Sequence, residues 1–302
     1  MDRRRYTLIG LAAVVMWSTL ALLTAGSGAV PPFLMNALCF GISGAVGLAI
    51  LIARDGSLAV LRQPWPVWLV GIGGLFGYHF FYFTALKAAP PVEAGLICYL
   101  WPLLIVLLSG LLPGERLRPH HVVGALLGLI GAALIVTRGG QVAFAPQYVL
   151  GYGAALVAAF VWAIYSLASR RLPKVPSDAV VGFCLATAAL SAVCHLGLET
   201  TVWPAGTGEW TAVVLLGLFP VGLAFFVWDI GVKRGDIQVL GAASYAAPLL
   251  STLLLVAFGY GSLDWVVAAA CLLISGGGLF AARDLLLRKP AERHLPGRQR
   301  AG

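Results

Sequence analysis

The side chains best suited to do chemistry are aromatic ones that recur at a fixed spacing. Among the Trp and Tyr side chains well inside apolar stretches, three have aromatic partners 145 or 146 positions further on: Trp17 with Trp162, Tyr82 with Trp228, and Tyr99 with Tyr245. Such rings offer flat apolar walls, cation–π partners for an ammonium group, and hydroxyl or indole donors. This chemistry suits the binding of a small organic molecule, whereas helix packing is the alternative explanation for any one ring. We expect the binding residues to be Trp17, Tyr78, His79, Tyr82, Tyr99, Trp101, Trp162, Tyr165, Trp228, Ser244 and Tyr245.

Polar groups within apolar stretches need a partner or a watery cavity, and three of the ionisable side chains there are considered as site candidates. His79 lies near the middle of its stretch, so it either lines the site or finds a hydrogen-bond partner. Asp229 precedes Lys233 by one helical turn, which predicts an i,i+4 ion pair. Glu93 begins a stretch, where a carboxylate favours the positive end of the helix dipole. A structural role is therefore favoured for Glu93 and Asp229.

Two prolines, Pro102 and Pro248, are repeat-related in the same way and also fall within apolar stretches. Proline has no N–H, so each one should free the carbonyl four residues earlier, at Cys98 and Ser244. We expect both prolines to kink their helices and to serve as gating points. The freed carbonyls could bind a ligand, or neighbouring helices could satisfy them.

The elements that must position these residues are membrane-spanning helices. The 302 residues are 60% hydrophobic and 11% charged, whereas soluble domains are roughly 25% charged. Runs of about 20 apolar residues, enough to cross a hydrocarbon core of ~30 Å, follow one another with short connections. The ten predicted spans cover about residues 6–25, 32–53, 66–87, 91–112, 120–137, 149–170, 178–197, 210–231, 236–258 and 264–282. The predicted fold class is an all-α membrane protein of ten transmembrane helices, with no soluble catalytic domain.

The basic residues indicate how the spans are oriented. If ten spans start from the inside, 18 of the 20 Lys and Arg lie in cytoplasmic segments, and only Lys87 and Arg138 lie elsewhere. The positive-inside rule then predicts that both termini are cytoplasmic. The net charge of +8 therefore reflects topology and lipid headgroup contact, and no nucleic acid is expected as a partner. The first run resembles a signal peptide but exceeds the usual h-region of about 7–15 residues, so we expect it to be retained.

The chain also looks like two copies of one unit. Four residue types recur exactly 146 positions on: Lys87 as Lys233, Gly95 as Gly241, Tyr99 as Tyr245, and Pro102 as Pro248. Each copy holds an odd number of spans, so the second copy enters the membrane upside down. We expect a first five-helix repeat at residues 1–140 and an inverted second repeat at 141–302, ending in a short basic cytoplasmic tail. This arrangement is typical of secondary transporters with a central site between the halves.

Several other classes of site and function are disfavoured. The five cysteines are odd in number, show no C-x-x-C spacing and fall within predicted spans, which is typical of small apolar fillers. We expect no metal site and no cofactor. An enzyme within the membrane would need a catalytic constellation, and the chain has no H-E-x-x-H motif and no Ser/His dyad with suggestive spacing.

Two segments carry a resemblance to a known family. Residues 83–87 (FTALK) and 94–102 (AGLICYLWP), with the span and charge pattern, resemble the EamA-type drug/metabolite transporter superfamily over residues 5–285. Residues 93–103 more narrowly resemble the YddG-type aromatic amino acid exporters, in which a Tyr-Leu-Trp-Pro run marks the fourth helix. The resemblance implies a multi-pass protein of the bacterial inner membrane that exports aromatic and other neutral amino acids by alternating access. A drug, nucleotide-sugar or other metabolite carrier of the same fold is the alternative.

The residues leave the energy source of such transport open. Proton coupling would have to use His79, Glu93 or Asp229, whereas facilitated transport down a metabolite gradient needs none of them. The expected partners are a small-molecule substrate and the lipid bilayer. The oligomeric state is not predicted.

Overall fold

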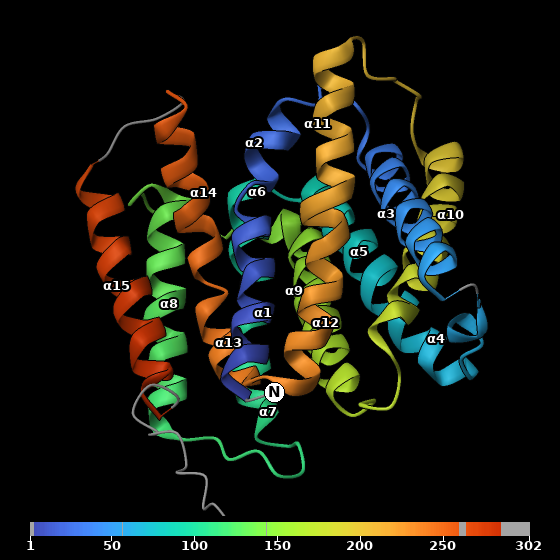
Figure 1. Cartoon of the computed structure of the whole chain (residues 1–302). Coiled ribbons are helices and arrows are strands. Elements are labelled where there is room, and N and C mark those ends of the chain that lie inside the picture. Colours follow the sequence, from blue (N-terminus) through green and yellow to red (C-terminus); the bar gives the residue numbers. More distant parts are fainter. Residues whose placement is uncertain (1–2, 56, 143, 260–263, 285–302) are drawn as a thin grey trace, which may run out of the picture.

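The computed structural model describes residues 3–55, 57–142, 144–259 and 264–284, which form a bundle of helices without a strand (Figure 1). Within these ranges, nine helical stretches are long and apolar enough to cross a membrane: Arg3–Ala25, Pro32–Arg54, Trp65–Ala88, Pro91–Ser109, Pro119–Thr137, Pro146–Arg170, Ser177–Leu198, Thr207–Arg234 and Ile237–Ala257. A further apolar helix, Trp265–Ala281, has 17 residues. All ten segments agree closely with the predicted spans at both ends. The chain is a multi-pass membrane protein.

Five of the predicted spans are single α-helices: α3 (Pro32–Asp55), α8 (Pro119–Thr137), α9 (Val149–Arg170), α10 (Val180–Leu198) and α15 (Trp265–Ala281). The others are interrupted and comprise α1 (Arg3–Trp17) with α2 (Leu20–Ala25); α4 (Trp65–Ile72), η2 (Gly73–Gly77) and α5 (Tyr78–Ala88); α6 (Pro91–Cys98) with α7 (Trp101–Ser109); α11 (Thr207–Leu218), η5 (Phe219–Leu223) and α12 (Ala224–Arg234); and α13 (Ile237–Ala243) with α14 (Ala246–Ala257). Short 3₁₀ turns occur at η1 (Ala59–Leu61), η3 (Pro146–Tyr148) and η4 (Ser177–Ala179).

The interruptions recur at the spacing of the sequence repeat. The two π-helical turns begin at Gly73 in η2 and at Phe219 in η5, which are equivalent positions of the two predicted halves. The break after Cys98, between α6 and α7, likewise matches the break after Ala243, between α13 and α14. Because π turns inside α-helices are rare and frequent at functional sites, the matched interruptions mark the part of the bundle where a site is expected.

The two prolines lie where their spans are interrupted, and neither one kinks a continuous helix. Pro102 is the second residue of α7 and Pro248 the third of α14, where a missing N–H disturbs the helix least. The expectation that the Ser244 carbonyl is freed is wrong. It accepts a hydrogen bond of 3.1 Å from the amide of Ala247, because the chain makes a tight i→i+3 turn between α13 and α14.

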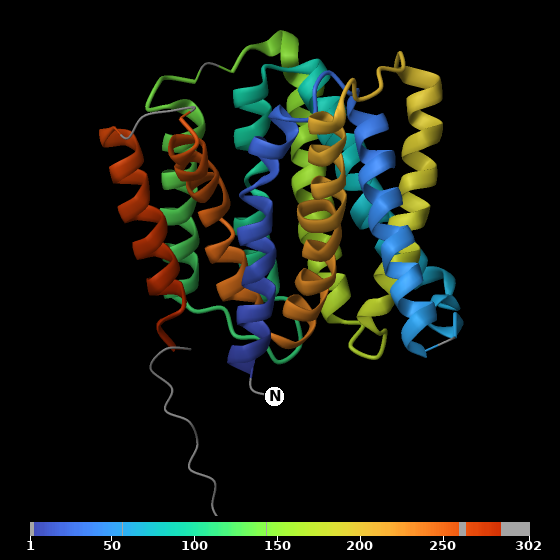
Figure 2. The same cartoon turned by 45° about the horizontal axis from the view of Figure 1, so that its top comes forward.

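Helices from the two predicted halves pack in pairs (Figures 1 and 2). The pairs are α1 with α12, α3 with α10, α5 with α9, α7 with α13, and α8 with α15. Glycines allow two of these pairs to approach closely. A Cβ at Gly10 would lie 2.9 Å from the Cα of Gly231, and a Cβ at Gly124 would lie 2.5 Å from the carbonyl oxygen of Gly277. In the α1–α12 and α8–α15 pairs the two backbones are therefore in direct contact.

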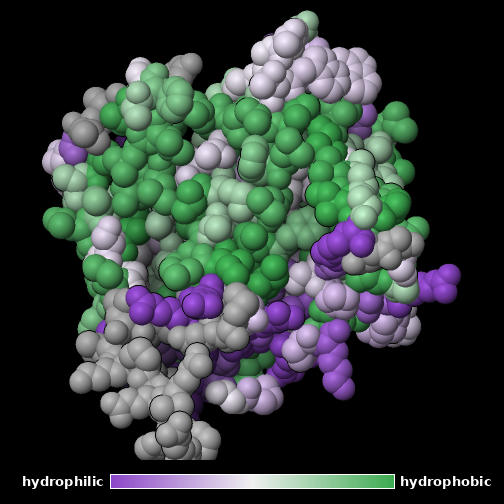
Figure 3. Space-filling model, in the orientation of Figure 1, coloured by the Kyte–Doolittle hydropathy of each residue, from purple (hydrophilic) through white to green (hydrophobic). Residues whose placement is uncertain are grey.

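Polarity separates the two ends of the bundle from its middle. Hydrophobic side chains cover the middle, and hydrophilic ones gather at the end that carries the N-terminus (Figure 3). We call this end the N-terminal end and the other the opposite end. The apolar belt is what a chain surrounded by lipid requires.

Candidate functional site

A cavity of about 710 Å³ lies among the spans. It runs from rings in the middle of the bundle to Ser27 and Gly28, in the connection between α2 and α3. That connection lies at the opposite end from the N-terminus (Figure 1). Seven of the predicted binding residues line this cavity: Trp17, Tyr78, His79, Tyr82, Tyr99, Trp101 and Trp162.

Four tryptophans from four spans meet where the cavity ends towards the N-terminal end. They are Trp17 in α1, Trp101 in α7, Trp162 in α9 and Trp228 in α12. Every pair among them has ring centroids between 5.1 and 6.2 Å apart, within the range of favourable aromatic contacts. The interruption of α1 after Trp17 and the start of α7 at Trp101 put two of these rings at helix ends. We call the cluster the tryptophan floor.

The tyrosines and His79 form one wall above this floor. The rings of Tyr78 and Tyr82 stack with centroids 5.8 Å apart, and Tyr78 contacts Trp162 at 5.4 Å. The Nδ1 atom of His79 lies 2.7 Å from the carbonyl oxygen of Leu75. A carbonyl can only accept, so Nδ1 carries a proton, and Nε2 is an acceptor whenever the ring is neutral. The wall therefore offers an imidazole nitrogen and phenol groups beside apolar rings.

Four predicted residues are buried and do not line the cavity: Tyr165, Trp228, Ser244 and Tyr245. Trp228 is fully buried and donates to the Ser166 hydroxyl at 3.1 Å. Tyr245 is also fully buried, and its hydroxyl accepts a hydrogen bond of 3.1 Å from the Leu103 amide. Packing of α13 against α7 and α8 encloses Tyr245 among helices. Pro248 lines the cavity, whereas Pro102 does not.

The two carboxylates named as coupling candidates lie away from the cavity lining. Asp229 is buried and pairs with Lys233 at 2.7 Å, which confirms the predicted i,i+4 pair. It also accepts from the Ser177 hydroxyl at 2.5 Å. Glu93, in the first turn of α6, accepts a hydrogen bond from Tyr152. Both carboxylates thus have structural partners.

Sequence reasoning missed several cavity residues. Asn36 in α3 lines the cavity and donates a hydrogen bond of 2.7 Å to the Ser191 hydroxyl in α10. Phe83 and Phe225 also line it. An amide inside a span was a usable signal for Asn36, but a phenylalanine in the cavity cannot be told from one facing lipid by sequence alone.

A second polar cluster, at the opposite end of the bundle, was also missed. Glu199, which follows α10, accepts hydrogen bonds of 3.0 and 3.2 Å from the Phe33 and Leu34 amides in the first turn of α3. It also contacts His195 at 3.0 Å and Lys87 at 3.5 Å. Burial alone would raise the pKa of this carboxyl, but the hydrogen bonds and the nearby positive charge outweigh it and hold the pKa below 4.5.

The arrangement as a whole suits reversible binding of a small molecule. Its volume lies within the roughly 300–1,000 Å³ typical of small-molecule sites, and its lining is mostly apolar with a few polar groups. Among the residues that the structure describes, no group of three or more His, Cys, Asp and Glu side chains could hold a metal ion.

Comparisons with known proteins place the chain among transporters. A family model described as the EamA-like transporter family matches residues 4–137 and 149–283. The aromatic amino acid exporter YddG of Ancylobacter novellus is 61% identical over 290 residues, which are 96% of this chain and 100% of that protein. YddG of Escherichia coli is 27% identical over 92% of this chain and 97% of its own length. A solved crystal structure with 60% sequence identity superimposes with a TM-score of 0.90 and covers 96% of this chain and 100% of its own.

Proposed function

Because the chain belongs to the EamA-like transporter family, we propose that it exports aromatic and other neutral amino acids by alternating access around the central cavity. The observation that carries this proposal is the cavity above the tryptophan floor, which is sized for a small molecule and walled by rings and hydrogen-bonding groups. A relative named as an aromatic amino acid exporter, 61% identical over nearly the whole chain, supports the substrate class. The chain is a transporter and not an enzyme.

Different parts of the cavity suit the apolar side chain and the two charged groups of an amino acid. Trp17, Trp101 and Trp162 offer apolar faces to the substrate side chain. The charged ammonium and carboxylate groups must exchange water for hydrogen bonds, and Nε2 of His79 can accept one from the ammonium. In this proposal the hydroxyls of Tyr82 and Tyr99 donate hydrogen bonds to the carboxylate. In this proposal four buried residues support the cavity lining from outside it: Tyr165, Trp228, Ser244 and Tyr245.

The proposed topology has ten transmembrane helices in two inverted repeats, residues 1–140 and 141–302, with both termini cytoplasmic. The interruptions at equivalent positions of the two halves support the repeat. The helix pairing supports it too, because exchanging the halves converts the α1–α12 pair into the α9–α5 pair and maps the α3–α10 and α8–α15 pairs onto themselves. The 18-to-2 partition of basic residues supports the orientation. The YddG relatives of Ancylobacter novellus and Escherichia coli are named as exporters, which supports the bacterial inner membrane as the proposed location.

In this proposal the two prolines mark gating points, where their spans are interrupted. Pro102 and Pro248 start new helical segments beside the cavity, so the two segments of each span can change their relative tilt without breaking regular helix. Facilitated export down the metabolite gradient is the proposed energy source, because Glu93 and Asp229 are engaged by Tyr152 and Lys233.

Counterflow in proteoliposomes tests the proposed substrate class. Liposomes loaded with unlabelled phenylalanine, tyrosine or tryptophan should accumulate the labelled amino acid transiently, whereas liposomes loaded with unrelated cations or sugars should not. Trp101→Ala is the matched variant, since it removes one face of the floor while the protein should still fold. Counterflow with a nucleotide sugar or a hydrophobic cation, and none with amino acids, would favour a metabolite or drug carrier of the same fold.

A further inference from the structure

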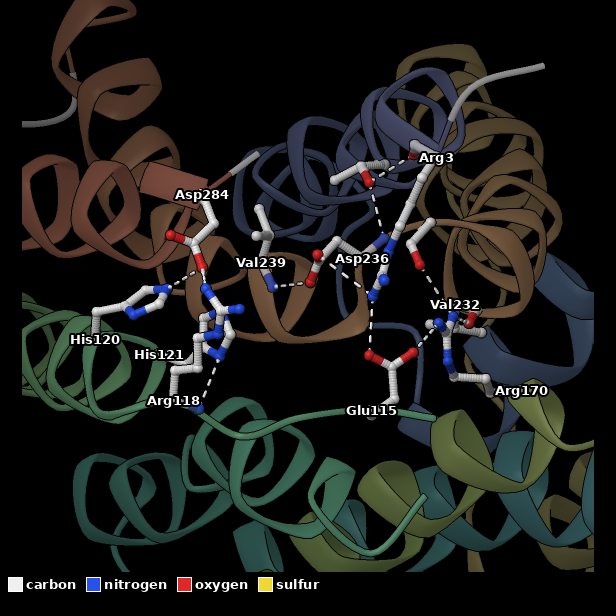
Figure 4. Close-up of polar contacts among 12 residues, drawn as sticks. Arg3, Glu115, Arg118, His120, His121, Arg170, Val232, Asp236, Val239 and Asp284 are labelled. Atoms are coloured by element: carbon white, nitrogen blue, oxygen red, sulfur yellow. Dashed lines mark hydrogen bonds and ion pairs between the residues drawn. The ribbon is translucent and has the colours of Figure 1, made fainter. Parts of the chain in front are cut away.

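A cluster of ion pairs joins several spans at the N-terminal end of the bundle (Figure 4). At its centre is Glu115, in the segment between α7 and α8, whose side chain is 7% exposed. One of its oxygens accepts a hydrogen bond of 2.9 Å from Arg3 in α1. The other accepts from Arg170, the last residue of α9. A single, nearly enclosed carboxylate thus holds guanidinium groups from two different spans.

The same guanidinium groups extend the cluster to two further spans (Figure 4). Arg170 donates hydrogen bonds of 2.6 and 3.0 Å to the carbonyl oxygens of Val232 and Gly235, at the end of α12. Arg3 lies 3.4 Å from the carboxylate of Asp236, the N-cap of α13. These contacts satisfy carbonyls that a helix end leaves without partners, and they tie α1, α9, α12 and α13 to the segment after α7.

Four of the helices joined in this way carry the tryptophan floor. Trp17 is in α1, Trp101 in α7, Trp162 in α9 and Trp228 in α12. In α12 the carbonyl of Val232 lies one helical turn beyond Trp228. The ion-pair cluster is therefore a second layer between the floor and the N-terminal end, while the cavity extends towards the opposite end.

We propose that Arg3, Glu115 and Arg170 form a latch that holds the cytoplasmic side of the transporter closed while the cavity is open to the outside. The inference rests on the proposed alternating access and names the contacts that must break in each cycle. When the four floor helices separate at this end, Arg3 and Arg170 can no longer both reach Glu115. Loss of the latch should thus favour the inward-open state.

The position of the latch allows it to break and re-form. Separating a buried ion pair is costly when the charges stay out of water. Here the cluster is at the aqueous end of the bundle, and Arg3 is already 38% exposed. Opening this end brings water to all three groups, and solvated ion pairs contribute little. The latch therefore favours the closed arrangement without preventing the open one.

The pair Arg118–Asp284 provides a matched control at the same end (Figure 4). It joins the beginning of α8 to the residues after α15. These two helices contribute no ring to the floor, and their backbones are in contact at Gly124 and Gly277. Because the two helices stay packed along their length, breaking this pair should not change access to the cavity.

Cysteine accessibility measures the two sides of the transporter separately. All five native cysteines are replaced by alanine, and one reporter is introduced at a time into the protein in lipid nanodiscs. Ser169→Cys reports on the cytoplasmic side, since Ser169 is buried next to Arg170 in α9. Ser251→Cys reports on the outer side, since Ser251 lines the cavity in α14. Each reporter is labelled with a water-soluble maleimide in the Glu115→Gln, Arg3→Gln and Asp284→Asn backgrounds.

The latch predicts opposite changes at the two reporters. Glu115→Gln should raise the labelling rate of Ser169→Cys about tenfold or more and lower that of Ser251→Cys, because a minor state populated at roughly 0.1–10% becomes a major one. Arg3→Gln should change both rates in the same directions by a smaller factor, and it decides the question if Glu115→Gln does not fold. Asp284→Asn should leave both rates unchanged.

Three results would overturn the latch. They are unchanged rates in the Glu115 and Arg3 variants, faster labelling at both reporters (which indicates loosening of the fold), and an equal effect of Asp284→Asn. None of these readouts requires a substrate. Absence of amino acid counterflow by the wild type would instead contradict the proposed function, so the two failures are distinguishable.

Discussion

The indole nitrogen of Trp17 donates a hydrogen bond of 3.1 Å to the carbonyl oxygen of Pro220. Pro220 lies in η5, the π-helical turn between α11 and α12. A π turn displaces backbone groups from their regular partners, and this carbonyl is satisfied by a side chain from the other predicted half of the chain. The contact links a ring of the tryptophan floor to the irregular backbone beside the cavity.

Trp17→Phe should therefore weaken both the fold and transport. Phenylalanine keeps an aromatic ring but cannot donate, so a buried carbonyl loses its partner at a cost of about 1–3 kcal/mol. We expect a lower unfolding temperature and slower amino acid counterflow. Trp265→Phe is the control, because that ring is 70% exposed and should tolerate the change. An unfolding temperature equal to that of the wild type would show that the hydrogen bond contributes nothing.

The repeat-related residues Tyr99 and Tyr245 should respond differently to the same substitution. Tyr245→Phe leaves the Leu103 amide without its acceptor, so stability should fall by about 1–3 kcal/mol. Tyr99 lines the cavity, so Tyr99→Phe should keep stability and raise the KM for an aromatic amino acid, by roughly tenfold if a hydrogen bond to a charged group is lost. Thermal unfolding and counterflow on both variants distinguish the roles. Equal effects on stability would contradict this division.

Much of the fold follows from the sequence because lipid imposes simple rules on a spanning chain. Apolar length and the positions of basic residues define spans whose boundaries agree closely with the observed helices. The sequence repeat, with the rings beside it, also identified seven residues that meet in one cavity. Equivalent positions of a repeat share the same depth in the bundle, so the sequence repeat can predict which residues lie near one another.

The direction in which each ring points could not be obtained in this way. Tyr99 and Tyr245 are equivalent by repeat, yet only Tyr99 reaches the cavity, because the cavity extends towards one end and is therefore asymmetric between the halves. The Glu115 and Glu199 clusters were missed for another reason. Each carboxylate lies in a connecting segment and meets partners from spans that are distant in the sequence, and such contacts are not encoded in local patterns.

The contacts of Glu199 should make the folded protein less stable in acid. The folded protein holds its pKa below the ordinary value of 4.5, so the charged carboxylate stabilises the fold above that pH. This contribution is lost as the pH falls through the lowered pKa. Wild type should thus be more stable than Glu199→Gln at pH 7, by about 1–2 kcal/mol, and the difference should shrink below pH 4.5. A difference in unfolding temperature that stays constant from neutral to acidic pH would refute the assignment.

His79 should contact the substrate and not couple transport to protons. Its Nδ1 proton is held by Leu75, and the carboxylates that could complete a proton path are paired elsewhere. His79→Gln should keep partial counterflow, and transport by the wild type should survive collapse of the proton gradient by an uncoupler. Concentrative transport that the uncoupler abolishes, and that His79→Gln loses while exchange persists, would show a coupling role instead.

The location of a bound substrate tests the central claim most directly. A crystal structure with 4-bromophenylalanine, recorded at the bromine absorption edge, should give one anomalous peak inside the cavity, over the faces of Trp17, Trp101 and Trp162 and within the reach of His79. Competition by L-phenylalanine should remove the peak. A bromine peak outside the cavity, or no peak at a concentration that saturates counterflow, would contradict the account.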